Sequence, residues 1–186
     1  MQRFALATLY YSTDGGNWSD GGWLESNHEC DWGDSDDQFA DLTCSQESAI
    51  QELNLFQDNL SGRIPIELAL LTLLTHLELF SNQLTGFIPS EIGLLTQLTL
   101  LSLWQNQLMG SIPSEFGLLT QLMSLFLFNN ELTGPLPSEL GILTQLTELW
   151  LYNNELTGSM PSSFCSADLR PFIDCGEITC TCCACV

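Results

Sequence analysis

The sequence contains no lysine, and its basic side chains are limited to Arg3, Arg63 and Arg170. Against these stand 23 aspartates and glutamates, which set the formal net charge of the 186-residue chain at -20. Nucleic acids and anionic lipids are bound by cationic surfaces that displace their counterions. We therefore expect no nucleic-acid partner.

Long hydrophobic runs are missing too, although apolar residues make up 45% of the chain. A membrane-spanning helix needs roughly 20 consecutive apolar residues, and no uninterrupted run approaches that length. The first residues, MQRFALATLYYS, lack the charged n-region and the long apolar h-region of a secretion signal. We expect a mature segment that does not itself insert into a membrane and that is a monomer in isolation.

Histidine occurs only as His28, near the N-terminus, and His76, in the middle of the chain. Because the two lie in different segments, we expect neither a paired-histidine metal site nor a hydrolase triad, and we predict a protein that is not an enzyme and has no cofactor. An acidic run near the N-terminus could instead hold Ca²⁺, but it lacks the glycine and the bidentate glutamate of an EF-hand loop, so no metal is expected. This run comprises Asp31, Asp34, Asp36, Asp37 and Asp41.

Eight cysteines gather at the two ends of the chain, which is typical of a protein from an oxidising compartment. Two of them, Cys30 and Cys44, precede the middle of the chain. The other six are Cys165, Cys175, Cys180, Cys182, Cys183 and Cys185. This dense cluster could bind a metal, but disulfides are favoured, because the last unit of a repeat array needs a cap over its core. Two N-x-S sequons, at Asn17 and Asn59, predict glycosylation of a secreted or cell-surface protein.

The middle of the chain repeats itself every 24 residues without slippage. The copies are LNLFQDNLSGRIP from Leu53, LELFSNQLTGFIP from Leu77, LSLWQNQLMGSIP from Leu101, LFLFNNELTGPLP from Leu125 and LWLYNNELTGSMP from Leu149. Five copies in register are not a coincidence. They predict a solenoid in which each copy forms one coil and stacks on its neighbours.

Each repeated position has a physical role. The two leucines of L-x-L point from a short strand into the core, while the residues between and after them point to the opposite, solvent-facing side. The glycine marks a tight turn that needs a positive φ, and the proline starts a short turn of 3₁₀ or α character. The asparagines can satisfy buried backbone groups after each strand, which predicts an asparagine ladder. This ladder comprises Asn82, Asn106, Asn130 and Asn154, with Asp58 at its first position.

The motif L-x-L-x-x-N-x-L-x-G-x-I-P resembles the plant-type class of leucine-rich repeats, as in receptor-kinase ectodomains and polygalacturonase-inhibiting proteins. The resemblance implies an α/β solenoid: a short right-handed array with a concave parallel β-sheet and disulfide-stapled caps. It implies a disulfide between Cys30 and Cys44. It divides the chain into an N-terminal cap (1–48), five repeats (49–164) and a Cys-rich C-terminal cap (165–186).

The ending FCSADLRPFIDCGEITCTCCACV is more similar to secreted repeat proteins of diatom-type algae. If the 24-residue register continues into this segment, Ile173 and Cys175 occupy the two leucine positions of a truncated sixth repeat. Cys175 would then lie inside the end of the core.

The solvent-facing residue after the second leucine is aromatic in all five copies. Because neighbouring strands lie about 4.8 Å apart, these side chains predict a continuous aromatic ladder on the concave sheet. The aromatic ladder comprises Phe56, Phe80, Trp104, Phe128 and Tyr152. Two further aromatics, Phe126 and Trp150, lie between the leucines of the last two copies and widen the displayed surface there.

Polar side chains flank the aromatic ladder on both sides. One side carries Glu52, His76, Ser124 and Glu148, and the other carries Gln57, Ser81, Gln105, Asn129 and Asn153. Amides beside aromatic rings suit a peptide or a sugar. The glutamates on this face, which include Glu78, favour a basic or neutral ligand over an anionic one.

Two functions remain open at this point. A contiguous aromatic patch is typical of a binding surface, which predicts an extracellular recognition module for a protein or peptide, with a glycan as an alternative ligand. Alternatively, the aromatic rings cover one another and only shield the sheet, as in a structural or protective extracellular protein such as a cell-wall component or an ice-binding protein. The ice-binding alternative would act through a column of threonines: Thr72, Thr96, Thr120 and Thr144.

Overall fold

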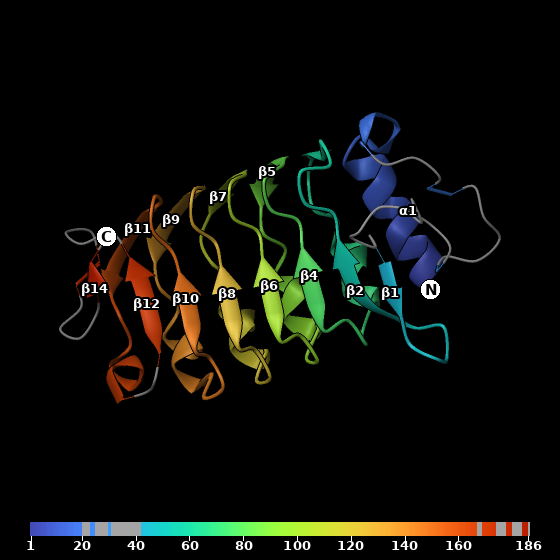
Figure 1. Ribbon diagram of the computed structural model, residues 1–186. Helices are drawn as coiled ribbons and strands as arrows, with labels where there is room; N and C mark the ends of the chain where they lie inside the picture. The colour runs from blue at the N-terminus through green and yellow to red at the C-terminus, as the bar shows by residue number, and fades with distance from the viewer. Residues whose placement is uncertain are drawn as a thin grey trace.

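Successive repeats form stacked coils of a solenoid in the computed structural model of the chain (Figure 1). The structure describes residues 1–19, 23–24, 30, 42–166, 169–173, 178–179 and 184–185. One helix, α1 (Gln2–Ser12), lies at the N-terminal end of the array (Figure 1). None of the helices within these residues has the length and the apolar character that a membrane-spanning helix requires.

One strand from each coil contributes to an eight-stranded concave sheet. Its strands, in spatial order, are β1 (Leu42–Cys44), β2 (Ile50–Asn54), β4 (His76–Glu78), β6 (Leu100–Ser102), β8 (Ser124–Phe126), β10 (Glu148–Trp150), β12 (Arg170–Ile173) and β14 (Ala184–Cys185). All neighbours are parallel except β1, which pairs antiparallel with β2. From Leu53 to Leu149 the first leucine of each copy pairs with its counterpart in the next. The predicted concave parallel sheet is confirmed.

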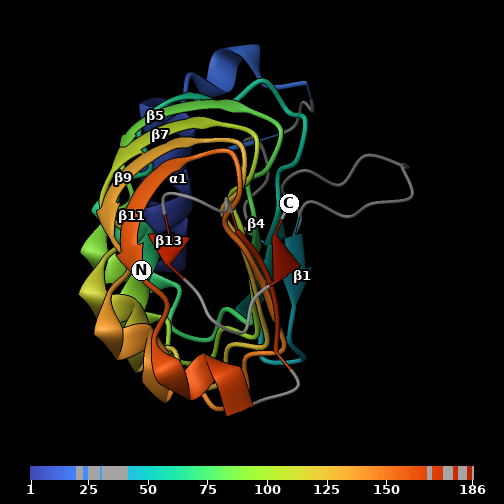
Figure 2. The same cartoon turned by 90° about the vertical axis from the view of Figure 1, so that its left-hand side faces the viewer.

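A second sheet of six strands was not predicted from the sequence. Its strands are β3 (Ser61–Gly62), β5 (Gln83–Phe87), β7 (Gln107–Gly110), β9 (Glu131–Pro135), β11 (Glu155–Ser159) and β13 (Ile178–Thr179). The strands of this sheet from β3 to β11 contain the glycine of each repeat, where the sequence indicated only a turn. When viewed along the solenoid, the strands of the two sheets lie on opposite sides of the coil (Figure 2).

A short 3₁₀ helix follows the proline of each repeat, which confirms the predicted turn. These helices are η3 (Ile66–Leu70), η4 (Ser90–Leu94), η5 (Ser114–Leu118), η6 (Ser138–Ile142) and η7 (Ser162–Ser166). Side chains three apart eclipse one another in a 3₁₀ helix. Ile92 at the centre of η4 and Leu95 just after it are accordingly both buried in the core.

The asparagine ladder forms as predicted. The Asn106 side chain donates hydrogen bonds from Nδ2 to the carbonyls of Leu79 (2.9 Å) and Leu103 (3.1 Å), and its Oδ1 accepts one from the backbone N–H of Leu84 (3.0 Å). Each asparagine thus ties its own coil to the preceding one. At the first position Asp58 is buried, and its backbone N–H donates to Oδ1 of Asn82 (3.1 Å).

The N-terminal cap joins the first coil through a continuous hydrophobic core. Leu6 and Leu9 of α1 are completely buried and belong to the same cluster as the repeat leucines. The backbone N–H of Ser61 donates to the carbonyl of Thr13 (3.0 Å). Gly62, with φ 101°, lies so close to the carbonyl oxygen of Ser12 that a Cβ atom would clash with it. A glycine is therefore required where the cap meets the repeats.

The disulfide that the family resemblance implied is present between Cys30 and Cys44. The side chains of the six C-terminal cysteines lie outside the described part of the chain, as do the residues of the aspartate run between Asp31 and Asp41.

The predicted register of the sixth repeat is wrong. Strand β12 places Pro171 opposite Leu149 and Phe172 opposite Trp150, so the leucine positions are held by Pro171 and Ile173 rather than by Ile173 and Cys175. The offset from Leu149 to Pro171 is 22 residues instead of 24. Ile173 is completely buried and closes the core at this end.

Candidate functional site

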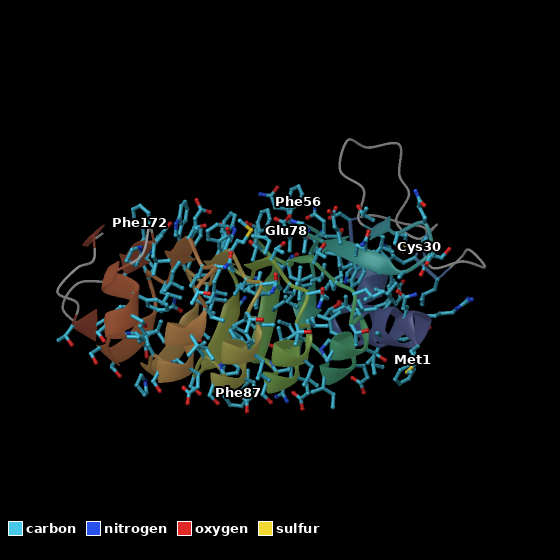
Figure 3. All side chains as sticks on the ribbon, turned by 90° about the horizontal axis from the view of Figure 1, so that it is seen from below. Met1, Cys30, Phe56, Glu78, Phe87 and Phe172 are labelled. Atoms are coloured by element: carbon cyan, nitrogen blue, oxygen red, sulfur yellow. A yellow bond between two sulfur atoms is a disulfide. The ribbon has the colours of Figure 1, made fainter. Side chains whose placement is uncertain are left out.

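The aromatic ladder forms a near-parallel stack along the concave sheet. Successive ring centroids are 4.9, 4.5, 4.9 and 4.6 Å apart, and the ring planes differ by 5° to 16°. This distance matches the separation of adjacent strands, so the backbone sets the stacking distance. Figure 3 shows Phe56 and Phe172 on the same side of the molecule.

Because the ladder rings stack face to face, they present mainly their edges to a ligand. The sequence predicted that the ladder rings are exposed to solvent, but Phe128 is only 8% exposed. Its ring is covered by Trp104 and Tyr152 on its two faces and by Trp150 beside it. A sugar binds aromatic side chains by lying flat on the ring, and these faces are already occupied.

The rings between the leucines are arranged differently. Phe126 and Trp150 lie 5.0 Å apart with a 60° angle between their planes, and Trp150 and Phe172 lie 5.3 Å apart at 69°. All three are half-buried. We call this trio of tilted rings the aromatic end of the concave sheet.

Phe172 was missed as a site residue. The predicted register placed Ile173, rather than Pro171, at the first leucine position. Phe172 was therefore not recognised as the outward residue between the two leucine positions. The signal that could have found it is the local pattern PFI, in which an aromatic residue lies between two apolar ones as in LFL and LWL.

The indole N–H of Trp150 is buried at the centre of the aromatic end. Among the described residues, it has no hydrogen-bond partner. Leaving a buried donor unpaired costs about 1–3 kcal/mol. A ligand oxygen that reached this N–H after a small movement of the ring would recover that free energy.

The opposite end of the same face is charged. Nδ1 of His76 lies 3.4 Å from Oε1 of Glu52 and 3.0 Å from the Thr75 hydroxyl. That hydroxyl donates its only hydrogen to the carbonyl of Gln51 (2.9 Å), so it accepts a hydrogen bond from His76 Nδ1–H. The imidazole is thereby held with its Nδ1 proton toward Thr75 and Glu52.

Glu78 completes what we call the acidic end of the sheet: Glu52, His76 and Glu78. Burial raises the pKa of the Glu78 carboxyl above its ordinary value; His76 opposes this rise and Glu52 adds to it. Glu78 lies on the same side of the molecule as Phe56 (Figure 3). A cationic ligand group placed here would favour the charged carboxylate.

The polar residues beside the aromatic ladder are preorganised by the backbone. The five residues that follow the ladder rings all have φ between 54° and 56°. They are Gln57, Ser81, Gln105, Asn129 and Asn153. Their side chains pair along the ladder: Ser81 Oγ donates to Gln105 Oε1 (3.2 Å) and Asn153 Nδ2 donates to Asn129 Oδ1 (2.6 Å).

On the other flank, Ser124 Oγ donates to Glu148 Oε2 (3.3 Å). The structure therefore brings the predicted ligand-binding residues onto one face. Glu148, which shares β10 with Trp150, adds a carboxylate beside the aromatic end.

The two sequon asparagines are exposed, but both already hold hydrogen bonds. Asn17 Nδ2 donates to Asp14 Oδ2 (2.7 Å), and Asn59 Nδ2 donates to Ser19 Oγ (3.1 Å). Since Ser19 is the serine of the Asn17 sequon, the two sequons lie side by side. Glycosylation at these positions stays a prediction.

Comparison with protein families finds leucine-rich repeats at residues 73–95, 97–119, 121–143 and 145–167. A comparison with curated protein sequences finds no match.

Among solved structures, the chain is similar to the BIR2 ectodomain from Arabidopsis thaliana, with a TM-score of 0.81 and 29% identity over 91% of this chain and 88% of that chain. It is also similar to a chain of the BIR3–SERK2 complex from A. thaliana, with a TM-score of 0.76 and 30% identity over 98% of this chain and 99% of that chain. A plant ice-binding protein matches with a TM-score of 0.78 and 29% identity, over 95% of this chain and 56% of that chain. With its 24-residue period, its asparagine ladder and these relatives, the chain belongs to the leucine-rich-repeat family and to its plant-type class.

Proposed function

We propose that this protein is an extracellular recognition module that binds an extended peptide or protein segment along the concave sheet. The tilted rings of Phe126, Trp150 and Phe172 carry this proposal, because they are the aromatic rings on this face that are not stacked in parallel. The leucine-rich-repeat fold is typically a non-enzymatic binding module, and the similar BIR3–SERK2 structure is a protein–protein complex. The disulfide between Cys30 and Cys44 supports a secreted or cell-surface location.

The two ends of the face define the polarity of the ligand. The aromatic end favours apolar side chains, and the carboxylates of the acidic end favour a basic group. From β2 to β12 the sheet spans five strand intervals, or about 24 Å. An extended peptide of about seven residues covers this length. The ligand is therefore a short segment with an apolar side chain toward β12 and a basic one toward β2.

A displayed library of random heptapeptides tests this proposal. Wild-type protein is expected to enrich peptides that combine a basic and an apolar residue, and a Trp150→Ser, Phe172→Ser variant is expected to lose that enrichment. The matched control is Phe87→Ser, since Phe87 is 68% exposed and lies on the opposite side of the molecule (Figure 3). Native folding of each variant is checked by circular dichroism.

Equal enrichment on the wild type and the double variant would contradict the proposal. Loss with Phe87→Ser as well would also contradict it. A glycan array probed with the same three proteins tests whether the ligand is a glycan instead of a peptide. Glycan binding that depends on Trp150, without peptide enrichment, would replace the peptide by a sugar.

A second candidate, ice binding, is favoured by one specific observation. Thr72, Thr96, Thr120 and Thr144 are all exposed and recur at the repeat period, and a plant ice-binding protein shares the fold. Thermal hysteresis of the wild type, reduced in a Thr96→Gln, Thr120→Gln variant, would support this function. Absence of hysteresis at millimolar protein would exclude it.

A further inference from the structure

The outer face of the 3₁₀ helices carries exposed aliphatic side chains at the repeat period. They are Leu70 (37% exposed), Leu94 (56%), Leu118 (50%) and Ile142 (60%), which we call the aliphatic row. The helices stack as a layer that is distinct from both sheets (Figure 2). Aliphatic groups that recur in four consecutive coils form a continuous apolar surface rather than scattered exposed residues.

A row of carboxylates runs beside the aliphatic row. Each helix has a glutamate three residues before its exposed aliphatic residue, and side chains three apart lie on the same face of a 3₁₀ helix. This carboxylate row comprises Glu67, Glu91, Glu115 and Glu139. Serine hydroxyls donate to the last three at 3.2–3.3 Å, and in the described ranges none of the four forms an ion pair.

Close contact between consecutive helices makes the two rows continuous. A Cβ atom at Gly93 would clash with the backbone of Glu115, and one at Gly117 would lie 2.8 Å from Cβ of Glu139. The glycines therefore allow each helix to touch the next. The rows run along this stack without a gap.

The apolar surface widens and deepens over the first two helices. Ile66 replaces the serine of the other copies and is 55% exposed, and Leu73 replaces a glutamine and is 52% exposed. A hollow of about 260 Å³ lies here, lined by Ile66, Glu67, Ala69, Leu70, Glu91 and Leu94. A large apolar side chain of a partner fits such a hollow, with carboxylates at its rim.

We infer that this face is a second docking site, for a cationic amphipathic helix of a partner protein. Apolar side chains on one face of an α-helix recur about every 5.4 Å, close to the roughly 4.8 Å between neighbouring coils. Leucines of such a helix contact the aliphatic row, while lysines or arginines beside them pair with the carboxylate row.

The net charge of the chain favours a cationic helix over two other possible partners of this face, a second copy of the chain and an anionic membrane. With a net charge of -20, a second copy of the chain is repelled, and so is an anionic membrane.

The probe is a synthetic leucine–lysine peptide of about 14 residues, long enough for four helical turns and about 21 Å. Its affinity is measured by calorimetry at low and high salt. A Leu94→Gln, Leu118→Gln variant is expected to bind at least about tenfold more weakly, since apolar contacts carry the affinity. Glu91→Gln, Glu115→Gln is expected to weaken binding about threefold at low salt and less at high salt.

Two controls separate a specific site from general charge attraction. Glu131→Gln, Glu155→Gln removes the same number of charges from exposed positions in β9 and β11, and we expect less than about a twofold change. A peptide of the same composition with a scrambled, non-amphipathic order is expected not to bind. Equal loss in the two glutamate variants, or unchanged affinity in the leucine variant, would overturn the inference. Affinity that disappears in the Trp150→Ser, Phe172→Ser variant would place the peptide on the concave sheet and overturn it as well.

Discussion

The acidic and aromatic ends of the concave sheet are built on the same frame and present different chemistry. Behind both ends the paired leucines are buried, from Leu77 and Leu79 at one end to Leu149 and Leu151 at the other. At the outward position between each leucine pair, Glu78 and Ser102 give way to Phe126 and Trp150, and Phe172 holds the same position between Pro171 and Ile173. In a solenoid, the inward residues determine the coil, and the outward residues are free to differ from one coil to the next.

The column of ladder rings changes less than the column beside it. Phe56, Phe80, Trp104, Phe128 and Tyr152 stack with planes within 16° of one another at both ends. The chemical difference between the ends therefore resides in the residues between the leucines. Four predictions test whether the buried residues determine the coil independently of the outward residues.

The largest loss of stability is expected from substitution of the buried leucines. Leu79→Ala at the acidic end and Leu127→Ala at the aromatic end should each lower the free energy of unfolding by about 2–5 kcal/mol, because both side chains are completely buried. Denaturant unfolding of the two variants measures this cost. A large difference between them would show that the outward residues also stabilise the coil.

The asparagine ladder should contribute similarly at the two ends. Asn82→Ala removes donors to the carbonyls of Leu55 (2.7 Å) and Leu79 (3.1 Å), and Asn130→Ala removes the equivalent donors to Leu103 and Leu127 (both 3.0 Å). We expect each substitution to lower the free energy of unfolding by about 2–3 kcal/mol, because buried backbone carbonyls lose their hydrogen-bond donors. The control is Gln83→Ala at an exposed position, for which thermal unfolding should show almost no change.

Substitution of an outward residue should lower the free energy of unfolding more at the aromatic end than at the acidic end. Trp150→Ala should cost about 1–2 kcal/mol, because the indole contacts Phe126, Phe128 and Phe172. Glu52→Ala should cost less than about 0.5 kcal/mol, because its contact with His76 is solvent-exposed. Chemical denaturation of both variants in one buffer gives the comparison, and equal costs would refute it.

The smallest effect concerns Glu78. Since its pKa is raised in the folded protein, the folded state holds its proton more tightly than the unfolded state. Its contribution to stability is therefore present in acid and is lost as the pH rises through the raised pKa. Glu78→Gln should stabilise the protein at neutral pH by about 0.5 kcal/mol or less, and the difference should vanish below about pH 4. Melting curves at several pH values test this, and a destabilised variant at neutral pH would contradict it.

Local patterns made most of the frame predictable. The alternation in L-x-L identified both the buried leucines and the outward column, and the asparagine after each strand identified the ladder. The Cys30–Cys44 disulfide followed from the family resemblance. The buried leucines, the outward column and the asparagine ladder each depend on residues within one coil and on their repetition in the next.

Three features could not be predicted from the pattern of the repeats. Phe172 was hidden because the last repeat is two residues shorter than the others. The second sheet arises because segments around the glycines pair between coils, although a single copy indicates only a turn. Phe128 is covered because Trp104, Trp150 and Tyr152 surround it, which depends on ring orientation in three coils.

The sequence by itself determined which residues face the core, which face the solvent and how often each recurs, because side-chain direction alternates with the backbone of a strand. Only the tertiary structure decided which outward rings keep a face open to a ligand and where the aliphatic and carboxylate rows become contiguous. Both depend on how neighbouring coils pack, and packing is a property of side chains from different repeats in contact.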